Sequence, residues 1–174
     1  MLLKQPAKNL RGGLSLLEMM AATAIMATVT AAVVVVMNTG FSAWKAQEAD
    51  IDVLENGYGV LRHFARQLRQ ATAVTAITAA GNTTGSLSFT TVAGATCTWA
   101  RNASSDVYYN NGTSNQLLAK SIDSLTFTGY KADGVTATTT VTDLQVVQCQ
   151  LQITLPRGAG QTRTLTTRAW VRSW

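Results

Sequence analysis

One apolar run near the N-terminus constrains this chain more than any other feature. From Leu14 to Met37 it reads LSLLEMMAATAIMATVTAAVVVVM, 24 residues in which Glu18 is the only charged side chain. A helix needs about 20 apolar residues to cross a bilayer. The apolar region of an ordinary secretory signal is shorter, about 7–15 residues, and rarely contains an acid. The run therefore predicts a membrane-spanning helix, although small-residue sites such as Val29-Thr30-Ala31 leave a cleaved secretory signal as the alternative.

The segment before the run predicts its orientation. Residues 1–13 contain Lys4, Lys8 and Arg11 and no acid. Because basic residues favour the cytoplasmic side of a membrane, we expect this end to stay in the cytoplasm and the chain after Met37 to be exported.

Glu18 is an acid in an apolar surrounding. A charge inside a membrane helix costs on the order of 2.5–3.5 kcal/mol and usually has a partner. The neighbours three and four positions away along a helix are all uncharged. We therefore expect the compensating charge to come from a newly created group or from another chain. Cutting the chain after Gly13 creates such a group, the α-amino group of Leu14.

Arg11-Gly12-Gly13, the following Leu14-Ser15-Leu16-Leu17-Glu18 and the apolar run together resemble the class III signal peptide of type IV pilins and type II secretion pseudopilins. The resemblance implies that a prepilin peptidase cuts after Gly13 and methylates the amine of Leu14. It also implies that Glu18 contacts the N-terminal amine of a neighbouring subunit during assembly. Leu14 replaces the family's commoner phenylalanine, and the run lacks the proline of major pilins, which favours an unbroken helix. A plain membrane anchor with a stray acid is the competing interpretation.

A second helical stretch is predicted after the run. Asn38-Thr39-Gly40 predicts a loosening of the helix at the membrane surface, and Gly57 and Gly59 predict a distortion near Tyr58, since glycine weakens a helix. After Gly40 the helical period resumes and continues to about residue 72. The apolar stripe consists of Ile51, Leu54, Tyr58, Leu61, Ala65 and Leu68.

Charges on this second stretch are ordered as the helix dipole favours, with acids first and bases later. The acids are Glu48, Asp50, Asp52 and Glu55, and the bases are Arg62, Arg66 and Arg69. The three arginines are compatible with a nucleic-acid stripe, but we favour a solvated face or a face that meets neighbouring subunits, because only three bases occur and acids lie nearby. We expect His63 to be a surface or capping residue.

The second half of the chain predicts an antiparallel sheet. Short runs rich in threonine, valine and aromatic residues alternate with turn signals such as Asn111-Gly112 and Asp133-Gly134. The expected strands are Ser86–Val92, Ala95–Arg101, Asp106–Tyr109, Gln116–Lys120, Ser124–Tyr130, Leu144–Leu155 and Thr162–Val171. In the longest, apolar residues from Val147 to Leu155 alternate with glutamines, which predicts a strand buried on one face. The fold class is therefore α+β, a long N-terminal helix packed on antiparallel sheet.

The order of these elements narrows the resemblance. A helix ending at 61–71, a short strand at 87–89, the segment 117–127 and a terminal strand ending at 168–172 are similar to the J-type minor pseudopilin of type II secretion and the W-type minor pilin of type IV pili. This similarity implies a pilin-like fold for residues 41–174, after a cleaved leader at 1–13 and an assembly helix at 14–40.

Cys97 and Cys149 are the only cysteines, and both fall in predicted strands of the exported part. Disulfides persist outside the cytoplasm, so we expect them to form a bridge, with two buried free thiols as the alternative. Trp170 is expected in the core and Trp174 at the surface.

The sequence predicts neither enzyme activity nor a cofactor. It contains no nucleophile elbow, no glycine-rich phosphate loop and no cluster of metal ligands. The formal charge of +5 includes three bases in the leader, so the processed chain is nearly neutral and the case for nucleic acid weakens.

These observations predict a minor pilin-like subunit, anchored in the inner membrane with its domain in the periplasm. Its expected partners are prepilin peptidase and other pilin or pseudopilin subunits. A filament-borne binding module for DNA, a surface or an exoprotein is the alternative function.

Overall fold

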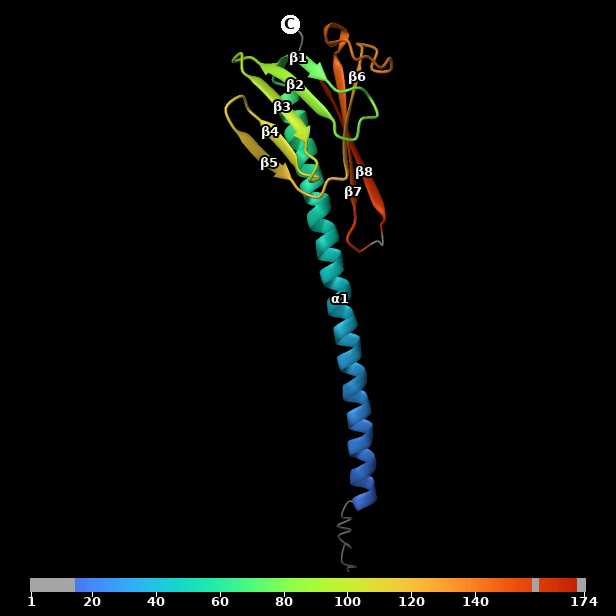
Figure 1. Cartoon of the computed structure of the whole chain (residues 1–174). Helices are drawn as coiled ribbons and strands as arrows, with labels where there is room; N and C mark the ends of the chain where they lie inside the picture. The colour runs from blue at the N-terminus through green and yellow to red at the C-terminus, as the bar shows by residue number, and fades with distance from the viewer. Residues whose placement is uncertain (1–14, 158–159, 172–174) are drawn as a thin grey trace, which may run out of the picture. The chain divides into compact units, whose positions relative to one another are not determined.

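The computed structural model describes residues 15–157 and 160–171. These divide into two compact units, with the boundary between Trp44 and Lys45. One helix, α1 (Leu16–Leu68), contributes to both units, and every strand belongs to the second (Figure 1). The expected leader at 1–13 lies outside the described residues. The remaining elements in chain order are β1 (Ala71–Ile77), β2 (Ser86–Thr91), β3 (Thr96–Arg101), β4 (Val107–Asn110), β5 (Asn115–Ala119), β6 (Ser124–Tyr130), η1 (Val141–Asp143), β7 (Val146–Thr154) and β8 (Thr162–Trp170).

Helix α1 is continuous over its 53 residues. The predicted loosening at Asn38-Thr39-Gly40 and the predicted distortion near Tyr58 are both wrong. At the first place, the Thr39 hydroxyl donates to the carbonyls of Val35 and Val36, both at 2.9 Å, so its hydroxyl is satisfied inside the helix. The helix ends at Leu68 rather than near residue 72, because the chain enters β1 at Ala71.

The strands form two antiparallel sheets. One has the order β1-β2-β3-β4-β5 and the other the order β6-β7-β8. All seven predicted strands are confirmed within two residues at each end, and β1 was not predicted. Its sequence, ATAVTAI, contains only small residues and two larger aliphatic ones, so its period is weak, and its pairing with β2 is interrupted by two register irregularities.

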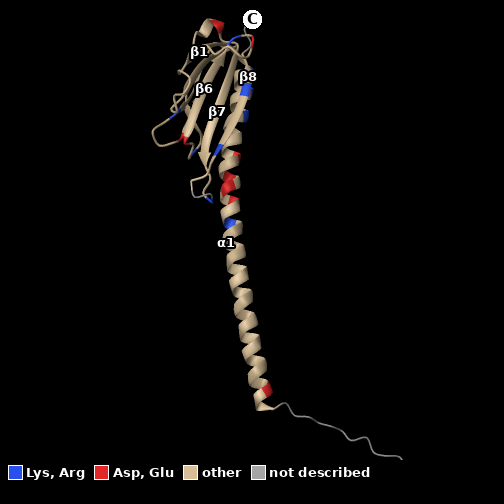
Figure 2. Ribbon diagram, turned by 90° about the vertical axis from the view of Figure 1, so that its right-hand side faces the viewer, with Lys and Arg blue, Asp and Glu red and all other residues tan. Residues whose placement is uncertain are grey.

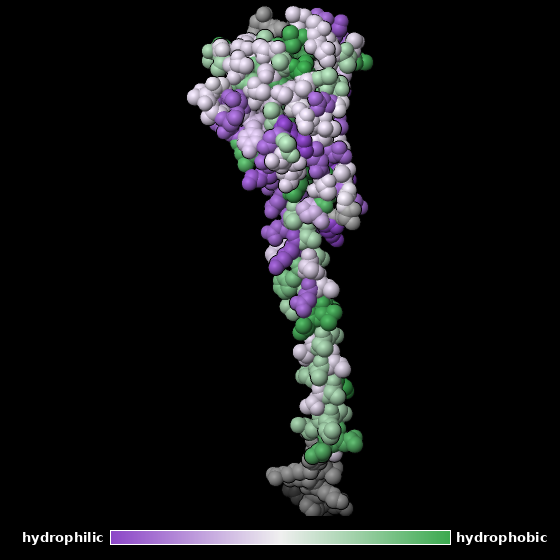
Figure 3. All heavy atoms as spheres, viewed as in Figure 1, coloured by the Kyte–Doolittle hydropathy of each residue, from purple (hydrophilic) through white to green (hydrophobic). Residues whose placement is uncertain are grey.

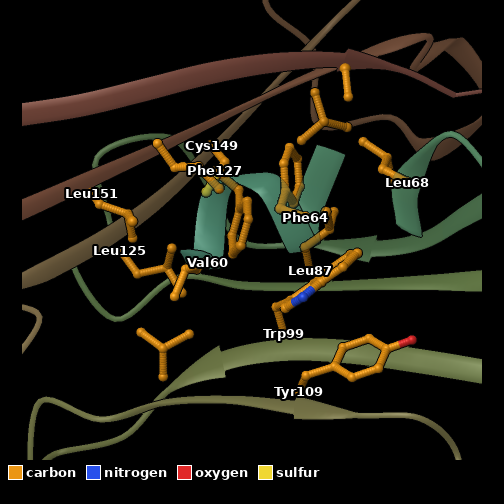
Figure 4. Close-up of a cluster of buried hydrophobic side chains, with 14 of the residues drawn as sticks. Val60, Phe64, Leu68, Leu87, Trp99, Tyr109, Leu125, Phe127, Cys149 and Leu151 are labelled. Atoms are coloured by element: carbon orange, nitrogen blue, oxygen red, sulfur yellow. The ribbon is translucent and has the colours of Figure 1, made fainter. Parts of the chain in front are cut away.

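The core of the second unit lies between α1 and both sheets. Phe64 connects them, with its ring 5.3 Å from that of Trp99 in β3 and 5.8 Å from that of Phe127 in β6 (Figure 4). A Cβ added to Gly57 would lie 2.8 Å from the Leu165 side chain of β8, so the helix approaches that sheet closely there.

The predicted apolar stripe on α1 is only partly correct. Leu61 and Leu68 are buried, but Ile51 and Tyr58 are 47% and 49% exposed. The helix residues that fill the core are Gly57, Val60, Leu61, Phe64 and Leu68. The buried stripe is therefore rotated around the helix relative to the predicted one. It is also wider than a single line of residues, because two sheets cover this side of the helix.

The longest strand behaves as predicted. In β7, Val147, Cys149, Leu151 and Ile153 are buried and the intervening glutamines are partly exposed. The prediction for Trp170 is wrong: its side chain is 58% exposed, because Ala169 and Leu165 face the core from β8 instead. Trp99 takes the central aromatic position and is 1% exposed, while Trp174 lies outside the described residues.

Candidate functional site

Glu18 lies in the first turn of α1 and forms a reciprocal cap with Ser15. The Ser15 N–H donates to Glu18 Oε2 at 3.3 Å, and the Glu18 N–H donates to Ser15 Oγ at 3.2 Å. This is the capping-box arrangement, in which a serine and an acid three residues later satisfy each other's backbone donors. Gly13 and Leu14, the predicted cleavage and methylation residues, lie outside the described residues.

The capping box gives Glu18 a first partner, because a backbone donor of its own first turn serves one carboxylate oxygen. An N–H group carries no full charge, so the expected compensating charge from a new group or another chain stays a prediction. Ser15-Leu16-Leu17-Glu18 fits the capping pattern, so the sequence contained this signal. Within the described residues, Oε1 has no hydrogen-bond partner and the side chain is exposed, so the charge itself remains available to another group.

The surface of α1 next to Glu18 is apolar and uncovered. Every residue from Ser15 to Lys45 is exposed, and no charged side chain lies between Glu18 and Lys45 (Figure 2). In the space-filling view most of this stretch is hydrophobic (Figure 3). By length and composition α1 is able to cross a membrane.

Hydroxyl groups on this apolar stretch are satisfied inside the helix. Thr23, Thr28 and Thr30 donate to the carbonyls of Met20, Ile25 and Met26 at 2.8–2.9 Å. Thr39 and Ser42 donate in the same manner. A polar group that is bonded within its own helix suits an apolar surrounding, where no water is present to pair with it. This role of the threonines was not predicted, although their place in an apolar run was the available signal.

His63 lies in a cleft between α1 and β5. Its neighbours there are Gly59, Arg62, Arg66 and Leu118. The prediction of a surface or capping histidine is only partly correct, because the ring is half-buried and packs edge-on against Tyr109, with centroids 4.6 Å apart.

One hydrogen bond fixes the tautomer of His63. The Trp99 indole N–H donates to Nδ1 at 3.3 Å, and indole is only a donor, so neutral His63 carries its proton on Nε2. Burial lowers the pKa of His63, and the positive charge of Arg66 lowers it further. The ring is therefore held neutral near pH 7, which makes Nε2–H a fixed donor.

The two cysteines correct another prediction. Cys97 and Cys149 are free and buried, so the expected bridge is not formed and the alternative of two thiols holds. Cys97 lies on β3 and Cys149 on β7, which belong to different sheets. Burial raises the pKa of Cys149, so its thiol stays protonated and unreactive.

Among the described residues, no three His, Cys, Asp or Glu side chains come together as a metal site. Asp133 serves its own turn, where its carboxylate accepts the N–H groups of Val135 and Thr136, both at 2.9 Å. The hydrogen bond from the Thr136 hydroxyl is the main cause that lowers the pKa of Asp133, followed by those two N–H groups.

No family model, no curated protein and no solved structure matches the chain. Its function is therefore argued from the residues described above.

Proposed function

We propose that the chain is a minor pilin-like subunit of a type II secretion pseudopilus or a type IV pilus. In this role prepilin peptidase removes residues 1–13 and methylates Leu14. The subunit is anchored in the inner membrane with Lys45–Trp174 in the periplasm. It then joins the filament at its tip through α1.

The observation that carries the proposal is the placement of a single carboxylate on an otherwise uncharged helical surface. Glu18 is in the first turn of α1, and the next charged residue is Lys45. Such a surface needs lipid or other apolar helices to cover it. An acid at the start of the helix offers an ion pair to a cation on a neighbouring subunit, and in a low-dielectric bundle this attraction is strong.

The capping box supports the proposal because it holds the carboxylate in one place. Since Ser15 occupies only Oε2, the other oxygen is free to accept from an ammonium group. Cleavage would create a positively charged amine on Leu14, next to Ser15 in the sequence. The methylated N-terminus of one chain and the Glu18 carboxylate of a neighbouring chain would then carry opposite charges.

Replacing Glu18 with glutamine separates the two roles of this residue. Glutamine at this position also completes a capping box, so Glu18→Gln keeps the cap and removes the charge. We expect Glu18→Gln and Glu18→Ala to insert into the membrane normally and to be absent from purified filaments. Co-purification of each tagged variant with filaments, against membrane-fraction abundance, is the measurement.

Incorporation of Glu18→Gln at the wild-type level would reduce Glu18 to a capping residue and remove the main support for assembly. The N-terminal sequence and mass of the membrane-bound chain provide a second test. We expect a start at methylated Leu14, and a Gly13→Ala variant should remain uncleaved. A chain that begins at Met1 or after Ala31 would overturn the proposal.

A further inference from the structure

We propose that the exposed face of α1 in Lys45–Trp174 binds a second copy of this chain, with acids of one copy against bases of the other. The inference deepens the proposed filament role and rests on it only for the parallel orientation of the two copies. It concerns five charged residues on the exposed side of α1 and Arg69, which directly follows the helix.

The six residues form two sets with the same spacing. The acidic triad is Glu48, Asp52 and Glu55, and the basic triad is Arg62, Arg66 and Arg69. Within each triad the steps are four and three residues, which place the side chains on one stripe of a helix.

The two triads are offset by a constant interval. Each acid precedes its basic counterpart by 14 residues, for example Asp52 before Arg66. With a rise of 1.5 Å and about 3.6 residues per turn, this interval is about 21 Å along the helix and about 40° around it. Two parallel copies that face each other with a shift of 14 residues therefore align all three acids with all three bases.

Both triads are free to make such a contact. All six side chains are exposed, whereas Gly57, Phe64 and the other core residues of α1 occupy the opposite side. In the described parts of the chain the only ion pair is Lys131–Asp143, so neither triad is paired with another described residue. Figure 2 marks the positions of acidic and basic residues along this part of α1. Within one helix the nearest members of the two triads, Glu55 and Arg62, are seven residues apart, about 10 Å along the axis, which is too far for a direct ion pair.

The basic triad borders a hollow that is suited to a carboxylate. Arg62 and Arg66 line the cleft of about 460 Å³ with Gly59, where an added Cβ would meet nothing within 4 Å. Among the described residues every buried side-chain nitrogen or oxygen has a partner, so His63 Nε2, which has none, is open to solvent. Two guanidinium groups and a fixed N–H donor are therefore available to an acid from the second copy.

The contact repeats instead of closing. The acidic triad of one copy occupies the basic triad of the next, so each pair leaves one triad free at either end. The free triad at either end is open to a further subunit. Nucleic acid is a weaker fit, because the acidic triad lies on nearly the same side of the helix and repels phosphate.

Charge reversal tests the surface in the full chain, purified in detergent micelles. The first variant carries Glu48→Lys, Asp52→Lys and Glu55→Lys, and the second carries Arg62→Glu, Arg66→Glu and Arg69→Glu. We expect the dissociation constant for self-association of each variant alone to rise about tenfold or more, because three modest exposed ion pairs become repulsive. A mixture of the two variants should recover association, since it restores opposite charges. Binding between two fluorescently labelled copies gives the dissociation constants.

A matched control reverses three exposed bases outside this face. The variant Lys120→Glu, Arg157→Glu and Arg163→Glu changes the net charge as the second variant does, and we expect wild-type association. Unchanged association of both triad variants, or a mixture that does not recover, would overturn the proposal. Loss of binding to a labelled DNA duplex by the arginine variant, with self-association unaffected, would also overturn it and assign the face to nucleic acid.

Cross-linking tests the register. A copy with Asp52→Cys should form a disulfide with a copy carrying Arg66→Cys, but not with another Asp52→Cys copy, and the native cysteines are buried and do not compete. Equal cross-linking of both combinations would contradict the shift of 14 residues. Repeating the binding measurement with Glu18→Gln separates this surface from the filament role, because that variant should still self-associate through the triads even if it never enters a filament.

Discussion

Two stretches of the same helix use their side chains in opposite ways. From Leu16 to Trp44 every residue of α1 is exposed, and apart from Glu18 the side chains are uncharged and mostly apolar all round. From Lys45 to Leu68 the helix has a buried apolar side, with Phe64 1% exposed, and a charged side. The backbone hydrogen bonding is continuous through both stretches. The helix itself is therefore set by local bonding, while the distribution of side chains decides what has to cover it.

The largest expected difference between the two stretches concerns folding stability. Phe64→Ala should lower the free energy of unfolding by about 3–5 kcal/mol, because it removes the ring that fills the space between the two sheets. Ile25→Ala, in the uncovered stretch, should leave it unchanged, since Ile25 is 64% exposed. Urea titration of the full chain in micelles, followed by tryptophan fluorescence, measures both. Equal losses would mean that the first stretch is also part of the folded core.

Membrane insertion should show the reverse dependence. Ile25→Lys places a charge in the apolar stretch, at a cost of about 2.5–3.5 kcal/mol for insertion. Tyr58→Lys, on the same helix and 49% exposed, should insert normally. The fraction of each chain that resists alkaline extraction from membranes measures the effect. If Ile25→Lys were retained as well as Tyr58→Lys, the uncovered stretch would not be the membrane span.

A smaller effect is expected at the start of α1. Ser15→Ala removes the hydroxyl that accepts the Glu18 N–H and should cost about 1 kcal/mol of local helix stability. Thr23→Ala is the matched control, because the Thr23 hydroxyl only adds a bond to a carbonyl inside the helix. Amide hydrogen exchange in the first turn should accelerate in Ser15→Ala alone. Equal fraying in both variants would show that the cap does not hold this turn.

The smallest expected effect is a pH dependence of the second stretch. The pKa of His63 is lower in the folded chain than its ordinary value of 6.5, so between these two values the unfolded chain binds more protons. The contribution of His63 to the free energy of unfolding is therefore fully present above about pH 6.5 and falls as the pH drops below that value. His63→Gln retains an acceptor for Trp99 and should reduce this slope. Urea midpoints between pH 5 and 8 give the comparison, and identical slopes would exclude His63 as the source.

Strand positions were largely predictable from the sequence, whereas β1 was not. Alternation and turn signals are local properties, and they located Ser124–Tyr130 to the residue. Strand β1 has little alternation of large apolar and polar residues, and its hydrogen-bonded pairing with β2 makes it a strand. The rotation of the buried stripe toward Phe64 could not be predicted either, because it depends on where two sheets meet the helix.

The candidate sites differ in the same way. The position of Glu18 and its capping partner Ser15 could be recognised from four consecutive residues. The pairing of His63 with Trp99 joins residues 36 positions apart, so no local pattern indicates it. The unpaired state of Cys97 and Cys149, which lie on two different sheets, likewise depends on tertiary packing and not on any local pattern.

The sequence alone determined that this chain has an apolar helix with one acid in its first turn, followed by an α+β region, because hydropathy and short-range spacing are properties of neighbouring residues. It also contained the matched spacing of the acidic and basic triads. Only the tertiary structure decided which face of α1 is buried, and therefore that both triads remain exposed, since burial depends on contacts between residues far apart in the chain.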